Sequence, residues 1–91
     1  MPVILSPEAL ADLRHIRAYI AKDNPEAASR VAARLISACD RLDFLPNRGR
    51  PGRAPGTREF PVRPYVIVYR VTPGTVEIIR IWHMAQSRTN A

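Results

Sequence analysis

Hydrophobic residues in the C-terminal half of the chain occupy consecutive positions rather than alternate ones. The segments from Tyr65 to Val71 and from Val76 to His83 are rich in β-branched and aromatic residues, and a Thr-Pro-Gly-Thr loop separates them. That pattern predicts a β-hairpin. An antiparallel sheet usually alternates apolar and polar residues, because one of its faces meets water. The alternation is nearly absent here, and a chain this short has enough helix to cover only one face. We therefore expect the other face to be a docking surface for a partner.

Apolar residues in the N-terminal half recur at helical spacing after two similar start signals. Ser-Pro-Glu from Ser6 and Asn-Pro-Glu from Asn24 each supply an N-cap side chain, a proline at the first helical position and a first-turn acid. The apolar positions are Ala9, Leu13, Ile16 and Ile20 in the first predicted helix, and Ala28, Val31, Leu35, Cys39 (or Ala38) and Leu42 in the second. The first helix should end near Lys22 or Asp23, which predicts a tight helical hairpin. A short strand is expected before it, at residues 3–5.

Strand pairing predicts which side chains share a face of the sheet. If the hairpin loop sets Val71 opposite Val76, then Arg70 faces Glu77, and this pair of opposite charges supports the register. The same register sets Val68 opposite Ile79 and Val66 opposite Ile81. One face then holds Glu59, Val66, Val68, Arg70, Glu77, Ile79, Ile81 and His83, and the other holds Arg58, Phe60, Tyr65, Ile67, Tyr69, Ile78, Arg80 and Trp82. We expect the helices to cover the second face, because its aromatic side chains are larger and its arginines can extend past them into water.

These elements predict one α+β domain over residues 1–91, in the order β-α-α-β-β-β, with a helical hairpin packed on one face of a small, mostly antiparallel sheet. A strand over residues 57–62 precedes the hairpin. Residues 46–56 are rich in proline, glycine and arginine, and we expect a long loop there. Within it, Arg48-Gly49-Arg50-Pro51 is similar to the core of an AT-hook, whose arginines enter the DNA minor groove. Because it bridges a helix and a strand, a structural turn is the leading interpretation.

Composition narrows the class of protein. The net charge of +6 comes from thirteen arginines and one lysine against eight carboxylates, which favours phosphate or carboxylate partners. A high-GC genome would explain the ratio of arginine to lysine, but not the excess of positive charge. The single cysteine, Cys39, falls on an apolar stripe and is expected to pack as a small hydrophobe. We expect no metal and no cofactor, since only His15 and His83 supply imidazole and neither lies in a ligand cluster. No apolar run is long enough to span a bilayer, and with no secretion signal a cytoplasmic location is expected.

The order and spacing of six segments together resemble the ParE/RelE toxin superfamily over nearly the whole chain. They are residues 13–19, Asn-Pro-Glu-Ala-Ala at 24–28, Leu-Pro-Asn-Arg-Gly-Arg-Pro-Gly at 45–52, Gly-Thr-Arg-Glu-Phe at 56–60, Tyr-Val-Ile-Val-Tyr-Arg-Val at 65–71 and Ile-Arg-Ile-Trp-His at 79–83. The resemblance implies the toxin of a type II toxin–antitoxin pair, held inactive in a hetero-oligomer by a ParD-like antitoxin with an acidic segment. RelE-like members cut messenger RNA on the ribosome, and ParE-like members poison DNA gyrase.

The resemblance also allows the two branches to be compared at individual positions. RelE-like nucleases have an arginine at the second position of the central strand, where it stabilises charge on the scissile phosphate; this chain has Val66 there. They also tend to carry lysines and a C-terminal tyrosine or histidine, of which only His83 matches. Proton transfer at two oxygens needs more than one such group. The comparison favours the ParE-like branch. If the chain were RelE-like, His83 with Arg58 and Arg80 would be its catalytic candidates.

Two further sets of residues are candidates for contact with partners. Candidates for contact with the target are Arg50, Arg53, Arg58, Arg80, His83 and Arg88, and candidates for contact with the antitoxin are Val66, Val68, Arg70, Ile79 and Ile81. Structural roles remain open for several of them: Arg70 can pair with Glu77, and His83 can bond to backbone at a strand end. Three functions therefore stay under consideration: gyrase inhibition, ribosome-dependent cleavage of messenger RNA, and binding of nucleic acid by the arginine-rich loop.

Overall fold

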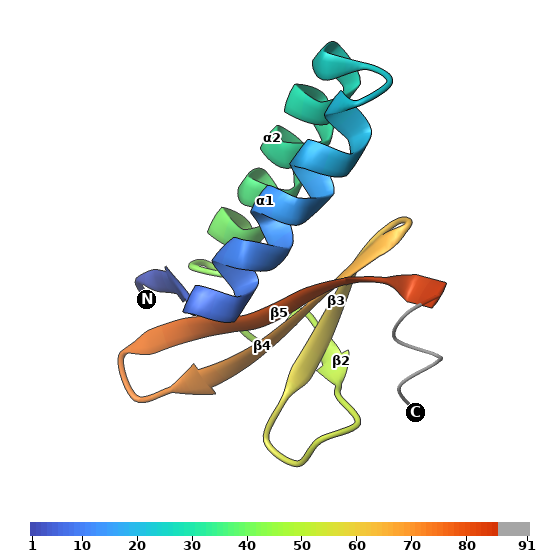
Figure 1. Cartoon of the computed structure of the whole chain (residues 1–91). Coiled ribbons are helices and arrows are strands. Elements are labelled where there is room, and N and C mark those ends of the chain that lie inside the picture. The colour runs from blue at the N-terminus through green and yellow to red at the C-terminus, as the bar shows by residue number, and fades with distance from the viewer. Residues whose placement is uncertain (86–91) are drawn as a thin grey trace.

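The computed structural model describes residues 1–85 and contains two helices and five strands (Figure 1). The elements are β1 (Val3–Leu5), α1 (Pro7–Ala21), α2 (Pro25–Arg41), β2 (Arg50–Pro51), β3 (Arg58–Val62), β4 (Tyr65–Thr72) and β5 (Thr75–His83). The strands form one sheet in the order β1-β5-β4-β3-β2, in which only β1 and β5 are parallel. The two helices form a hairpin on one side of this sheet. The α+β prediction is confirmed.

Both helices begin at the predicted residues. The Ser6 hydroxyl accepts a hydrogen bond from the backbone N–H of Ala9 at 3.0 Å, and the Asn24 side-chain oxygen accepts one from Ala27 at 3.0 Å. Each bond satisfies one of the backbone donors that a helix start leaves without a partner. The Ser6 hydroxyl also donates to the Ile79 carbonyl of β5 at 2.8 Å. The start of α1 is thereby fixed to the sheet.

Strand β2 lies within residues 46–56, where the sequence predicts a loop and no strand. Arg50 lies opposite Glu59 and Pro51 opposite Arg58, so β2 forms the edge of the sheet beside β3. A strand of two residues is too short to show any periodicity, and proline is tolerated only at such an edge. The strand therefore had no recognisable signal in the sequence.

The predicted register between β4 and β5 is correct near the hairpin loop and wrong beyond it. Arg70 lies opposite Glu77, but Val68 lies opposite Arg80, and not opposite Ile79. The register shifts between Val68 and Tyr69, which leaves Ile79 as an extra residue in β5. Such a β-bulge changes which side chains share a face in the rest of the strand.

The bulge corrects the predicted face of four residues, Arg80, Ile81, Trp82 and His83. His83 lies opposite Tyr65 and so shares the face of Tyr65 and Ile67, not that of Val66. Ile81 lies opposite Ile67, is 2% exposed and belongs to the core beneath the helices. Arg80 lies opposite Val68, and Trp82 lies opposite Val66. They therefore belong to the other face of the sheet, which we call the open face because the helices do not cover it. The expectation that the helices cover the aromatic face is therefore right for Tyr69, which is fully buried, and wrong for Trp82.

The core lies between the helical hairpin and the sheet. Its largest buried members are Leu35 of α2 and Leu42 directly after that helix, Ile67 and Tyr69 of β4, and Val76, Ile78 and Ile81 of β5. Cys39 is also buried there, and burial raises the pKa of its thiol to about 12. This environment fits a packing role, as predicted. Within residues 1–85, neither helix has the length and apolar character that a membrane span requires, and no cluster of three potential metal ligands occurs in that range.

Candidate functional site: an arginine-lined cavity on the open face

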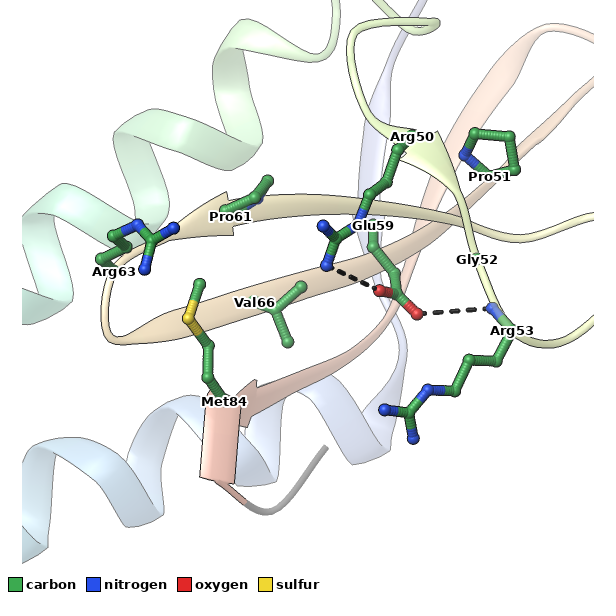
Figure 2. A pocket seen from close by; sticks show the side chains of 9 residues that line it. All are labelled: Arg50, Pro51, Gly52, Arg53, Glu59, Pro61, Arg63, Val66 and Met84. Carbon is green, nitrogen blue, oxygen red and sulfur yellow. Dashed lines mark hydrogen bonds and ion pairs between the residues drawn. The ribbon is translucent and has the colours of Figure 1, made fainter. Parts of the chain in front are cut away.

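The open face carries a cavity of about 510 Å³ near the end of the sheet where β2 lies (Figure 2). It is lined by Arg50 and Pro51 of β2, Gly52 and Arg53 after it, Glu59 and Pro61 of β3, Arg63 of the turn between β3 and β4, Val66 of β4 and Met84. Three guanidinium groups thus come from two segments of the chain, residues 50–53 and the turn at Arg63. Together with one carboxylate they give the lining a formal charge of +2.

Glu59 is the buried charged residue of this cavity. Its side chain is 11% exposed, and its carboxylate accepts hydrogen bonds from the Arg50 guanidinium and from the backbone N–H of Arg53, both at 3.4 Å (Figure 2). These distances exceed the 2.7–2.9 Å that is typical of charge-assisted bonds. Glu59 is therefore a loosely bound counter-ion for Arg50, whose side chain is 66% exposed.

Val66 forms part of the apolar lining. It is 2% exposed, although it does not belong to the core beneath the helices. In Figure 2 its side chain lies beside that of Met84, and the Met84 backbone N–H donates to the Pro64 carbonyl at 2.8 Å. The open face is thus partly covered by the chain's own residues at this end. Val66 is the position at which the RelE-like pattern has arginine, so that guanidinium is replaced here by an apolar surface.

The loop that carries Arg50 and Arg53 is fixed to the sheet by Tyr69. The hydroxyl of Tyr69 accepts a hydrogen bond from the Gly49 N–H and donates one to the Pro46 carbonyl, both at 2.8 Å. Gly49 permits this approach because a Cβ atom there would lie 2.7 Å from the Tyr69 hydroxyl oxygen and 2.9 Å from the Glu59 carbonyl oxygen. The backbone next to the cavity is therefore held in one position.

Arg58 also holds this loop. Its Nη1 donates to the Gly49 carbonyl at 2.7 Å and to the Asn47 carbonyl at 3.4 Å. Arg58 does not line the cavity. Its position opposite Tyr69 in the sheet directs it to the loop between α2 and β2. Its contacts are those of a structural residue.

Arg80 forms the tightest ion pair between a helix and the sheet. Its Nε and Nη2 donate to the two carboxylate oxygens of Asp12 in α1 at 2.7 and 2.9 Å, and Asp12 also accepts from the Ile81 N–H at 2.9 Å. Hydrogen bonding to Asp12 raises the pKa of the Arg80 guanidinium further above its ordinary value. The guanidinium carbon lies 5.0 Å from the centre of the Trp82 ring, within cation–π range. Arg80 is thereby occupied in fixing α1 to β5.

His83 lies at the end of β5 opposite Tyr65. Their rings meet edge to face with centroids 5.6 Å apart, and the His83 Nδ1 accepts from the Ala85 N–H at 3.1 Å. His83 lies opposite Tyr65, and Arg58 lies opposite Tyr69. Tyr65 and Tyr69 are four residues apart on β4, which corresponds to about 13 Å along a strand. The three residues that the RelE-like interpretation would use are therefore not gathered in one site, and none of them lines the cavity.

The candidates for antitoxin contact differ in exposure. Val66 and Ile81 are each 2% exposed, whereas Val68 and Ile79 are half-buried. Arg70 is exposed, and its Nε lies 3.7 Å from the Oε1 of Glu77. Only the last three offer appreciable side-chain surface in this structure. Arg88, a candidate for target contact, lies outside the described residues.

Sequence reasoning named Arg50 and Arg53 but missed Arg63, Glu59 and Met84 as parts of a site. Arg63 lies in the turn between β3 and β4. The turn between β3 and β4 could have been placed beside the arginine-rich loop if β2 had been recognised, because β2 brings that loop to the edge of β3. The missing signal was therefore the topology of the edge.

Comparison with known proteins agrees with this fold. The sequence model of the family described as "ParE toxin of type II toxin-antitoxin system, parDE" matches residues 3–88. The chain belongs to the ParE toxin family. This ParE-family protein is 48% identical over 80 residues to the putative toxin Y4kP of Sinorhizobium fredii, covering 86% of this chain and 82% of that protein. It is 46% identical over 84 residues to toxin RelE2 of Caulobacter vibrioides, covering 92% and 96% respectively.

Two solved structures resemble the ParE-family protein over most of their length. One is the chromosomal ParDE toxin–antitoxin system of P. aeruginosa, with a TM-score of 0.82 and 28% identity over 91% of this chain and 95% of that one. The other is the RelBE2 toxin–antitoxin complex of Mycobacterium tuberculosis, with a TM-score of 0.68 and 27% identity over 90% and 95%. Both ParE and RelE names occur among the relatives, so the protein is a type II toxin of the ParE/RelE superfamily.

Proposed function

We propose that this toxin acts on DNA gyrase without catalysing a reaction of its own, and that a cognate antitoxin neutralises it in the cytoplasm. The observation that carries the first part is the dispersal of the candidate catalytic groups. Arg58 holds a loop, Arg80 is paired with Asp12, and His83 lies at a strand end, two strands away from Arg58 and displaced from it by about 13 Å along the strand direction. Phosphodiester cleavage needs an acid, a base and a charge stabiliser in contact with one phosphate.

The residue at the central strand supports the same branch. RelE-like nucleases resemble one another in an arginine at the position that is Val66 here, and Val66 is buried at 2% exposure. An aliphatic side chain cannot neutralise charge on a phosphate. The match to the ParE family model over residues 3–88 points in the same direction.

The proposed antitoxin partner is supported by charge and by exposed apolar surface. A second hollow of about 530 Å³ lies between α2 and β3, where Phe60 and Val62 are flanked by Arg30, Arg34 and Arg41. Apolar side chains of a partner would enter such a hollow, while its carboxylates would meet the arginines. The similar P. aeruginosa and M. tuberculosis structures are described as toxin–antitoxin systems. We propose that an acidic antitoxin segment covers this hollow and the exposed parts of Val68, Arg70 and Ile79.

A supercoiling assay with purified gyrase tests the proposed target. Added toxin should block supercoiling, and a preformed complex with the product of the neighbouring reading frame should not. A parallel translation reaction with purified ribosomes should leave the messenger RNA intact. Cleaved message together with unaffected supercoiling would show that the proposal is wrong.

Ribosome-dependent cleavage of messenger RNA is the second candidate function, and one observation favours it. Glu59 places a partly buried carboxylate among arginines, which is the kind of group that can accept a proton. If cleavage occurs in the translation reaction, Glu59→Gln should abolish it, while Asp40→Asn on the exposed surface of α2 should not.

A further inference from the structure

We propose that the arginine-lined cavity binds the phosphodiester backbone of duplex DNA, with the phosphate taking the place of Glu59 at Arg50. This inference rests on the proposed gyrase function, in which the toxin meets an enzyme that holds DNA. It goes beyond that function because it assigns the contact to named residues and to the nucleic acid itself.

The arrangement of donors carries the first step. Arg50, Arg53 and Arg63 come from β2, from the segment after it and from the turn between β3 and β4, and all three line the same cavity (Figure 2). Guanidinium groups bind phosphate through two parallel N–H donors. The backbone beside Arg50 is fixed by the two hydrogen bonds of Tyr69, so less motion has to be lost on binding.

Glu59 carries the second step. Its two hydrogen bonds are 3.4 Å long, and the Arg50 side chain remains 66% exposed. A phosphate oxygen that approached Arg50 at the usual distance of about 2.8 Å would form a stronger bond than Glu59 does. When no phosphate is bound, the Glu59 carboxylate therefore neutralises part of the positive charge of the cavity. When a phosphate approaches, the carboxylate repels it and lowers the affinity of the cavity for DNA. Removing its charge should strengthen binding.

The apolar lining indicates which part of the nucleic acid is bound. None of the nine described lining residues is aromatic; the uncharged members with larger side chains are Pro51, Pro61, Val66 and Met84. Proteins that hold single-stranded bases stack them on aromatic rings. Contacts to phosphate alone carry no sequence information. We therefore expect binding to the duplex backbone, strong dependence on salt and no preference for sequence.

Fluorescence anisotropy with a labelled duplex of mixed sequence tests the proposal. The slope of log K against log[salt] should become less steep by about 0.9 in Arg63→Gln and by about 1.8 in Arg50→Gln/Arg63→Gln, because about 0.9 is lost per phosphate contact. The matched control is Arg14→Gln/Arg17→Gln on the exposed surface of α1, which removes the same charge and should leave the slope near the wild-type value. Equal changes in the two double variants would show attraction by net charge alone, and would overturn the proposal.

A second pair of variants tests the role of Glu59. Glu59→Gln should bind the duplex several-fold more tightly than Asp40→Asn, although each removes one negative charge. Equal affinities would contradict the proposal. The proposal would also be contradicted if the duplex did not bind while a single-stranded RNA or a poly-glutamate peptide bound in a way that depends on Arg63. Thermal unfolding of each variant checks the fold, and Arg63→Gln, which alters an exposed side chain, keeps the test valid if Arg50→Gln is unstable.

The outcomes separate this inference from the proposed function. If wild-type toxin blocks gyrase but the cavity variants bind DNA as well as it does, the cavity assignment fails and gyrase inhibition stands. If the salt slopes change as expected but supercoiling is unaffected, the cavity assignment stands and the proposed target is wrong.

Discussion

Removing one oxygen atom, in the substitution Tyr69→Phe, should release the loop beside the cavity. The Tyr69 hydroxyl accepts from the Gly49 N–H and donates to the Pro46 carbonyl, each at 2.8 Å, and the Tyr69 side chain is fully buried. Phenylalanine fills the same volume without these bonds. The substitution therefore tests the hydrogen bonds separately from the packing of the ring.

The size of the effect follows from the two bonds. A hydrogen bond contributes about 0.5–1.5 kcal/mol net, and a buried donor left without a partner costs about 1–3 kcal/mol. Gly49 is buried, so its N–H has little access to water in the native loop. We expect Tyr69→Phe to lower the free energy of unfolding by about 2–3 kcal/mol, and the Tm by about 10–20 °C for a domain of this size.

Chemical denaturation followed by circular dichroism measures the free energy of unfolding, and hydrogen exchange at the Gly49 amide measures the local stability of the loop. The matched control is Tyr19→Phe, because the Tyr19 side chain is 67% exposed. A surface change of that kind should alter stability by less than about 0.5 kcal/mol. If Tyr69→Phe were equally mild and the Gly49 amide kept its protection, the loop would not depend on the hydroxyl, and the reasoning would be refuted.

Three other perturbations have expected outcomes. Gly49→Ala should destabilise the protein by about 1–3 kcal/mol in urea unfolding, because its Cβ would lie 2.7 Å from the Tyr69 hydroxyl oxygen; a neutral result would contradict the close approach. Asp12→Asn should lower the free energy of unfolding by a similar amount, because it removes the charge-assisted bidentate pair that Asp12 forms with Arg80. A double-mutant cycle with Arg80→Gln should give a coupling energy above about 1 kcal/mol. The Cys39 thiol has a pKa raised to about 12 in the native state, so its contribution to stability is complete below its ordinary pKa and falls as pH rises above it; the stability difference from Cys39→Ala should therefore narrow between pH 8 and pH 11, and a constant difference would contradict this.

The helical half of the fold was predictable because its signals are local. Ser6 and Asn24 act as caps where the sequence indicated, and the Arg70–Glu77 pair fixes the hairpin register near its loop. The bulge at Ile79 has no local signal. It places Ile81 in the core beneath the helices, and that packing involves residues far away in the sequence.

The site was only partly predictable for a related reason. Arginine content and loop position drew attention to Arg50 and Arg53, but a cavity forms only where separate segments meet. Arg63 joins them through the sheet order, which places β2 beside β3. Conversely, Arg80 was a candidate for target contact because nothing in the sequence indicated its partner Asp12, which lies 68 residues away.

The contacts of Ser6 and Asp12 with β5 have a consequence for how the isolated toxin behaves at high concentration. Strand β1 covers β5 only as far as Ile78, and the backbone beyond it would present a template for another chain. The Ile79 carbonyl and the Ile81 N–H are instead occupied by side chains from the N-cap and first half of α1. Another chain could pair with this part of the β5 edge only after α1 had detached from it. The contacts of α1 therefore protect the molecule against edge-to-edge aggregation there.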